Sequence, residues 1–133
     1  MSNALYTKGK EGLLDGSINL ESHTIKCVLI DLADYTANLS THDNLDDVPA
    51  AARVGTPQTL GSKTFTNGTF DAADVVFPTV TGDPSEAILI YKDTGTESTS
   101  RLIALIDTAT GLPVSPVGAD ITVAWHASGI FSL

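Results

Sequence analysis

The segment His42 to Val54, HDNLDDVPAAARV, is the densest group of potentially reactive residues in this sequence. One histidine and three aspartates, at positions 42, 43, 46 and 47, could bind a cation or act as acids and bases. Their spacing does not fit an EF-hand loop, which needs alternating acidic positions and a central glycine. The segment also lacks the second histidine at helical spacing that would favour zinc.

A structural role explains the same segment more completely. Thr41 or Asp43 can cap a single helical turn, because their side-chain oxygens accept backbone N–H groups. Asp46 and Asp47 then lie in the positive N-terminal half of that turn, and Pro49 ends it. We therefore predict a capped turn between strands, with no metal site and no bound cofactor.

Other parts of the sequence give little support for catalysis. His23 and His126 are isolated, close to the ends of expected strands, as surface histidines often are. The sequence contains no GxSxG nucleophile motif and neither of the glycine-rich phosphate-binding motifs. We therefore predict a protein that is not an enzyme and has no catalytic residues.

Length and charge narrow the function further. The 133 residues fit one domain, 1–133. Seven basic against 16 acidic residues give a net charge of −9. Nucleic acids and anionic membranes attract basic surfaces, and no segment approaches the ~18 consecutive apolar residues of a membrane helix. We therefore expect neither nucleic acid nor membrane as a partner.

Residues 1–16 are the only good candidate for a helix. Ser2 or Asn3 can cap its beginning, and Gly16 is placed to end it. Gly9 weakens the helix by ~1 kcal/mol relative to alanine. We expect a short helix that packs on the rest of the domain or on a neighbour.

The remainder of the chain has the pattern of short strands separated by turns. Asn67-Gly68 is a strong signal for a two-residue hairpin, because both residues tolerate positive φ. Pro57 indicates a strand at a sheet edge or a bulge. The spacing predicts an all-β fold, a β-sandwich of about eight strands that could have jelly-roll order. The expected strands are residues 17–21, 24–32, 53–60, the pair flanking Asn67-Gly68, 74–80, 86–93, 101–107, 120–126 and 130–133.

Three expected strands, within CVLIDL, AILIY and LIALI, carry large aliphatic side chains on both faces. Left uncovered, Ile88, Ile90, Ile103 and Leu105 would form an exposed apolar row. One short helix is too small to cover three strands. We therefore predict a homo-oligomer, a dimer or trimer, in which these four residues contact another subunit.

The segment LPVSPVG, Leu112 to Gly118, is a second candidate contact. Pro113 and Pro116 make it stiff, and it carries no charge. Such a segment can lie across a neighbour at little cost in ordering entropy. A plain connection between two strands explains it equally well.

Cysteine and aromatic residues add two expectations. Cys27 is the only cysteine and lies in an apolar strand, so we expect a buried thiol rather than a disulfide or a nucleophile. Trp125 alternates with core residues and is expected in the core. Tyr35 and Tyr91 are the remaining candidates for a sugar-binding platform, which keeps a glycan-binding module open as an alternative.

Long phrases of the sequence resemble small virion proteins of tailed bacteriophages. They are THDNLDDVPAAARV, DAADVVF, SEAILIYKDTGTESTSRLIALIDTATGLPV and DITVAW, and the opening ALYTKGKEGLLDGSINLESHTIKCVLID fits the same pattern. The resemblance covers nearly the whole chain and contains no catalytic motif. Its closest role is that of a capsid decoration, or cement, protein, which is a small β-rich oligomer on the outer face of the shell.

This resemblance implies a partner and a location. The partner is the major capsid protein, and the location is the capsid exterior of a virion, after synthesis in the host cytoplasm. The negative charge suits an exterior component, because an interior one would face packaged DNA. A tail or connector component of the same kind of virion is the alternative.

Overall fold

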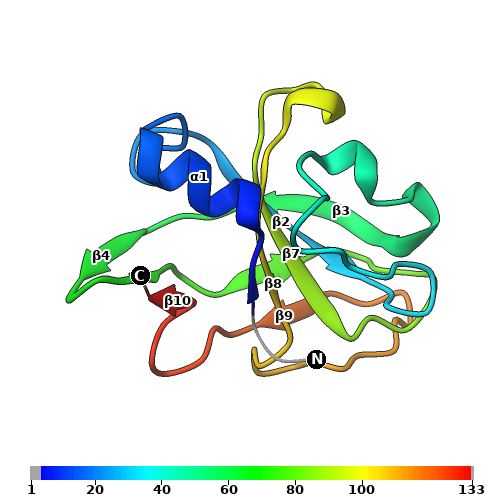
Figure 1. Ribbon diagram of the computed structural model, residues 1–133. Helices are drawn as coiled ribbons and strands as arrows, with labels where there is room; N and C mark the ends of the chain where they lie inside the picture. Colours follow the sequence, from blue (N-terminus) through cyan, green and yellow to red (C-terminus); the bar gives the residue numbers. More distant parts are fainter. Residues whose placement is uncertain (1–3, 133) are drawn as a thin grey trace.

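The computed structural model describes residues 4–132, which form ten strands, one α-helix and three 3₁₀ turns (Figure 1). The helix is α1 (Thr7–Asp15), and the turns are η1 (Leu45–Asp47), η2 (Ala50–Ala52) and η3 (Glu97–Thr99). The strands are β1 (Ala4–Leu5), β2 (Ile25–Ile30), β3 (Arg53–Thr59), β4 (Thr64–Thr66), β5 (Thr69–Asp71), β6 (Val75–Phe77), β7 (Ala87–Lys92), β8 (Leu102–Ile106), β9 (Ile121–Val123) and β10 (Phe131–Ser132).

The strands form three antiparallel sheets, of order β1-β8-β7-β2-β3, β10-β5-β4 and β6-β9. This arrangement confirms the predicted all-β, sandwich-like fold with a short N-terminal helix. Among the described residues, α1 is too short and too polar to cross a membrane.

The centre of the large sheet is formed by β2, β7 and β8, the three strands with aliphatic residues on both faces. β2 pairs with β7 without interruption, from Ile25 opposite Lys92 to Ile30 opposite Ala87. Because successive side chains of a strand point to opposite faces, this sheet has two apolar faces to bury. The structure contains one hydrophobic cluster on each face.

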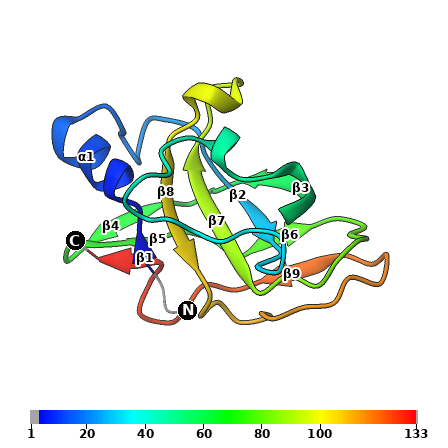
Figure 2. The same ribbon diagram turned by 45° about the vertical axis from the view of Figure 1, so that its right-hand side comes forward.

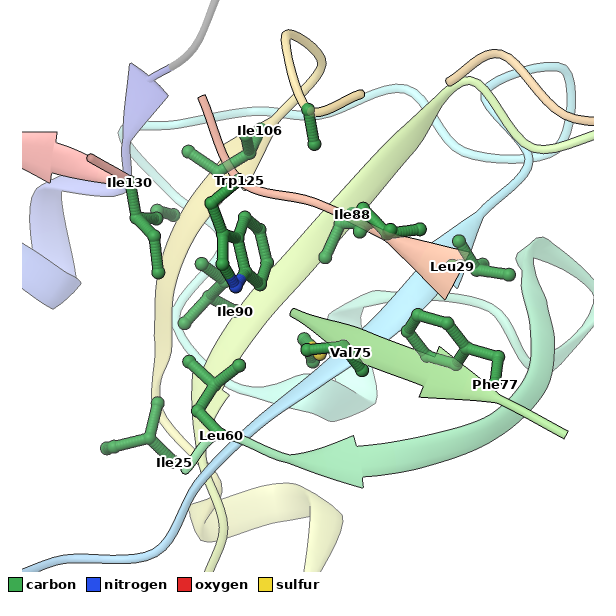
Figure 3. Packing of buried hydrophobic residues seen from close by; sticks show 14 of the residues in the cluster. Ile25, Leu29, Leu60, Val75, Phe77, Ile88, Ile90, Ile106, Trp125 and Ile130 are labelled. Atoms are coloured by element: carbon green, nitrogen blue, oxygen red, sulfur yellow. The ribbon is translucent and has the colours of Figure 1, made fainter. Parts of the chain in front are cut away.

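The first cluster lies between the large sheet and the β6–β9 pair (Figure 3). Phe77 of β6 and Ile88 and Ile90 of β7 are all fully buried there. Trp125 follows β9 and points into the same cluster, with 7% of its surface exposed and its Nε1 donating to the carbonyl of Ala73 at 3.1 Å. The prediction that Trp125 belongs to the core is confirmed.

The second cluster is covered by the chain itself. The long connection from β2 to β3, residues 31–52, passes over β7 and β8 (Figure 2). It places Tyr35, Leu45 and Val48 on this face, and Tyr6 joins them from the N-terminal segment. The missing cover is therefore an irregular segment with no strand pattern, which is why the sequence did not reveal it.

This finding corrects the prediction for the four aliphatic residues. Ile88, Ile90, Ile103 and Leu105 are each 0% exposed within a single chain, so they offer no surface to another subunit. They also do not form one row. Ile90 pairs with Ala104 and Tyr91 with Leu102, so Ile103 is an extra, bulged residue of β8. Leu105 belongs to the second cluster, on the face of the sheet opposite to that of Ile88 and Ile90.

The N-terminal region differs from the prediction at its beginning. Ala4 and Leu5 pair with β8, so the helix starts only at Thr7, and the proposed caps Ser2 and Asn3 lie outside the described residues. Gly16 ends the helix in the left-handed conformation, φ 85°, as predicted. The helix packs on β8 of its own chain.

Gly9 makes this close packing of α1 possible. A Cβ atom at Gly9 would lie 2.6 Å from the carbonyl oxygen of Leu102 and 2.8 Å from the Cα of Ile103. Both atoms belong to the β8 backbone, which side-chain rotation cannot move. The residue that lowers helix propensity is thus the one that lets the helix touch the sheet.

Two further strand predictions have clear outcomes. Residues 17–21 form a turn rather than a strand, in which the Asn19 side-chain oxygen accepts the backbone N–H groups of Glu21 and Ser22. The hairpin at Asn67-Gly68 is confirmed, with φ of 57° and 73° at the two positions. β3, which contains Pro57, lies at the sheet edge as predicted.

Candidate interaction surfaces

The acidic segment after His42 forms the predicted single turn, η1, but with a different cap. Asn44 rather than Thr41 or Asp43 occupies the cap position. The carboxylate of Asp47 accepts the backbone N–H of Asp43 at 2.8 Å and that of Asn44 at 3.4 Å. These hydrogen bonds, the one from Asp43 above all, hold the pKa of Asp47 below its usual value.

Arg53 fixes this turn against the sheet. Its guanidinium donates to the carbonyl oxygens of Val48, at 2.7 Å, and of Leu45, at 3.1 Å. It also forms an ion pair with Glu97 at 2.8 Å, which lowers the pKa of that carboxyl. Asp47 and Arg53 therefore hold this segment in place over the second cluster.

His42 belongs to a chain of hydrogen bonds that runs into the same cluster. Its Nδ1 accepts the backbone N–H of Asn38 at 3.2 Å and lies 2.9 Å from the hydroxyl of Tyr35. The Tyr35 hydroxyl in turn lies 2.7 Å from that of Tyr6. Burial raises the pKa of both tyrosines, so both stay protonated and able to donate.

The burial of these rings bears on glycan binding. Tyr35 is 3% exposed and Tyr91 is 2% exposed. Neither can act as a platform for a sugar ring, so the glycan-binding alternative loses the two aromatic residues on which it depended.

Two groups of carboxylates in the described residues have oxygens within 4.8 Å of each other. One group is Asp43, Asp46 and Asp47, and the other is Asp31, Asp34 and Asp83. In the first group the Asp47 carboxylate already accepts two backbone N–H groups. Either group could hold a cation only weakly without further ligands.

The loop from β8 to β9 is an uncharged and partly exposed segment. None of residues 108–119 is charged. Pro113 is exposed, Pro116 is half-buried, and Val117 is 85% exposed. Of the six residues predicted to make contacts, only these two prolines are therefore accessible.

Backbone hydrogen bonds hold this loop in place. Ser85 and Val114 exchange a pair of bonds, at 2.8 and 2.9 Å. Gly118 donates to the carbonyl of Val80 at 2.8 Å, and Val80 donates to that of Ala119 at 3.1 Å. Because the loop is fixed at both ends of its exposed part, it can bind a partner without a large loss of entropy.

A second apolar surface lies on the small sheet, at the opposite end of the molecule from this loop (Figures 1 and 2). Phe65, Phe70 and Phe131 stand side by side on β4, β5 and β10, with ring centroids 5.6 and 5.3 Å apart. Phe70 is buried, whereas Phe65 is 45% exposed. The sequence alone does not predict this row, because Phe131 joins it only through the pairing of β10 with β5.

Two cavities adjoin Phe65 in this phenylalanine row. One, of about 310 Å³, lies between Phe65 and the end of α1 with the turn that follows it. Leu13 of the helix and Glu21 of the turn line this cavity. The other, of about 190 Å³, lies over Phe70 and Phe131. Leu20 and Phe65 line both cavities, so the two cavities are neighbours.

No family model matches this chain, and no curated protein is recognisably similar to it. The fold and surfaces define the class: an acidic, sandwich-like all-β protein with two separate exposed apolar surfaces.

Proposed function

We propose that this protein is a non-enzymatic structural component of a tailed-bacteriophage virion, a decoration protein that binds the major capsid protein on the shell exterior. One observation supports a binding role above the others. The loop of residues 108–119 presents Pro113 and Val117 on a fixed, uncharged backbone. The resemblance of long sequence phrases to small virion proteins supports the assignment to a virion.

The charge of the protein fits the outside of a shell. A net charge of −9 disfavours contact with packaged DNA, so an exterior position is the favourable one. The uncharged loop is then the part of the surface that can approach another protein without first removing charge from water.

The proposed stabilisation is thermodynamic. A protein that binds the assembled shell, and not its separated subunits, stabilises the shell by mass action. Many copies of modest affinity suffice, because their contributions add over the shell. The contact then needs to be neither large nor catalytic.

Self-association remains a prediction, but the need to cover the aliphatic strands no longer supports it. Since Ile88, Ile90, Ile103 and Leu105 are already buried, a dimer or trimer is not needed to cover them. Any contact between copies must use exposed residues instead, of which Leu14, Val76 and Val117 are apolar examples.

Rebinding to shells tests the proposed function. Purified protein is added to phage shells that lack it, and bound copies and heat resistance are measured. We expect saturable binding, a higher disruption temperature, and loss of both with Val117→Asp. Leu14→Asp is the matched control, because Leu14 is also 85% exposed but lies on α1.

Two results would contradict this proposal. In one, shells neither rebind the protein nor gain heat resistance. In the other, both aspartate variants bind as well as the unchanged protein, so that the loop makes no contact. Binding confined to the tail or its connector would favour the alternative virion role.

A further inference from the structure

We propose that the outer edge of β4, together with the phenylalanine row, binds an extended segment of another protein by strand addition. The segment we infer has alternating apolar side chains and at least one basic residue. This inference does not depend on the proposed function, because it follows from the backbone, the cavities and the charges at this edge alone.

The backbone of Phe65 directs its hydrogen-bonding groups away from its own sheet. Phe65 lies opposite Phe70, and the carbonyl of Phe70 accepts the N–H of Ile130, the residue before β10, at 2.8 Å. Phe70 therefore directs its hydrogen-bonding groups away from β4, which makes Phe65 and Phe70 a non-hydrogen-bonded pair. The N–H and C=O of Phe65 must point outward, away from β5.

This outward edge is open. β4 is the last strand of its sheet, and all three of its residues are exposed. Within residues 4–132, no other segment forms a backbone hydrogen bond with Phe65. An exposed edge with outward N–H and C=O groups is a template for an added strand.

Apolar surface lies beside the open edge of β4. Phe65 is 45% exposed, and the cavities of about 310 and 190 Å³ adjoin it. Side chains of an added strand alternate between the two faces of the sheet. Those on the face of Phe65 would reach Leu20 and the phenylalanine row, which gives the site its preference for apolar residues.

Acidic residues lie close to the open edge of β4. Glu21 lines the larger cavity, and Asp71 is opposite Thr64 in the next strand. Lys63, the basic residue nearest to β4 in sequence, already donates to the carbonyl of His23 at 3.0 Å. With a net charge of −9, the protein also disfavours a second copy of itself here. These charges favour a partner segment with a lysine or arginine.

Peptide binding tests the proposal. The probe is a fluorescent peptide, Lys-Val-Thr-Val-Thr-Val-Lys, and the comparison peptide carries Glu at both ends. We expect the lysine peptide to bind more tightly, and Phe65→Ser to weaken its binding by at least about tenfold. Val76→Ser is the matched control, because Val76 is 46% exposed on another edge strand, β6, and should leave binding unchanged.

Hydrogen exchange of the unchanged protein gives a second readout that needs no variant. The peptide should slow exchange of the Phe65 amide and leave the Thr66 amide, which faces β5, nearly as it was. Undetectable peptide binding, equal loss in both serine variants, or binding without protection of Phe65 would overturn the proposal. Concentration-dependent protection of Phe65 without peptide would also overturn it, by assigning the edge to a second copy.

Discussion

The hydroxyl oxygens of Tyr6 and Tyr35 lie 2.7 Å apart within the second hydrophobic cluster. This hydrogen bond joins the residue that precedes α1 to the long connection after β2. Tyr6 is fully buried and Tyr35 is 3% exposed, so water cannot replace either partner without entering the core. The pair thus links two irregular segments that cover the same face of the sheet.

We expect Tyr35→Phe to destabilise the protein by about 1–3 kcal/mol, because it leaves the buried Tyr6 hydroxyl unpaired. Tyr6→Phe should cost less, since Tyr35 keeps its contact with His42. The double variant should lose less stability than the sum of the two single losses. Urea unfolding of the four proteins measures this, and strictly additive losses would contradict the proposed link.

Gly9→Ala should lower stability by about 1–3 kcal/mol, although alanine favours helices. The added Cβ would meet the β8 backbone at 2.6 Å. Gly12→Ala should cost less, because the nearest atoms there belong to the side chain of Ile18, which can rotate. Thermal unfolding distinguishes the two. A Gly9→Ala protein more stable than the original would show that the helix does not pack this closely.

Cys27 should not react with a thiol reagent at pH 8 while the protein is folded. The residue is fully buried, and burial raises the pKa of its thiol to about 12, so almost no thiolate is present. Labelling is followed with and without denaturant. Complete labelling of the folded protein within minutes would contradict the burial of β2.

Stability should fall at acidic pH partly through Asp47. Its pKa is lowered in the folded state, so its contribution is present above the unfolded carboxyl pKa of about 3.9 and is lost as the pH falls through the folded pKa. Asp47→Asn should therefore be less stable than the original at pH 7, by about 0.5–2 kcal/mol as for other lost caps. The difference should shrink below about pH 4.

Thermal unfolding between pH 7 and pH 3 measures this difference. Asp46→Asn is the control, because Asp46 lies exposed in the same turn and no hydrogen bond to its carboxylate is found in the described part of the chain. A stability difference for Asp47→Asn that does not change with pH would contradict a role for its charge.

Features set by neighbouring residues could be predicted from the sequence. Asn67-Gly68 fixes its hairpin because two adjacent residues accept positive φ. Gly16 ends α1 for the same local reason. Strands such as β7 and β8 are visible as short aliphatic runs, and Trp125 keeps the alternation of its neighbours.

Features set by distant contacts could not be predicted. Residues 31–52 have no regular pattern, and only the fold shows that Tyr35, Leu45 and Val48 cover the large sheet. The pattern of the aliphatic strands therefore predicts a partner subunit that the fold does not need. Phe131 likewise meets Phe70 only through strand pairing across the chain.

The proposed place of this protein on a capsid can be seen by electron cryomicroscopy of phage particles that contain it. We expect density of this fold, in a fixed copy number, on the outer face of the capsid, with the loop of residues 108–119 against the shell. Density for the protein inside the shell, or no density for it in the particle, would contradict its proposed role as a decoration protein.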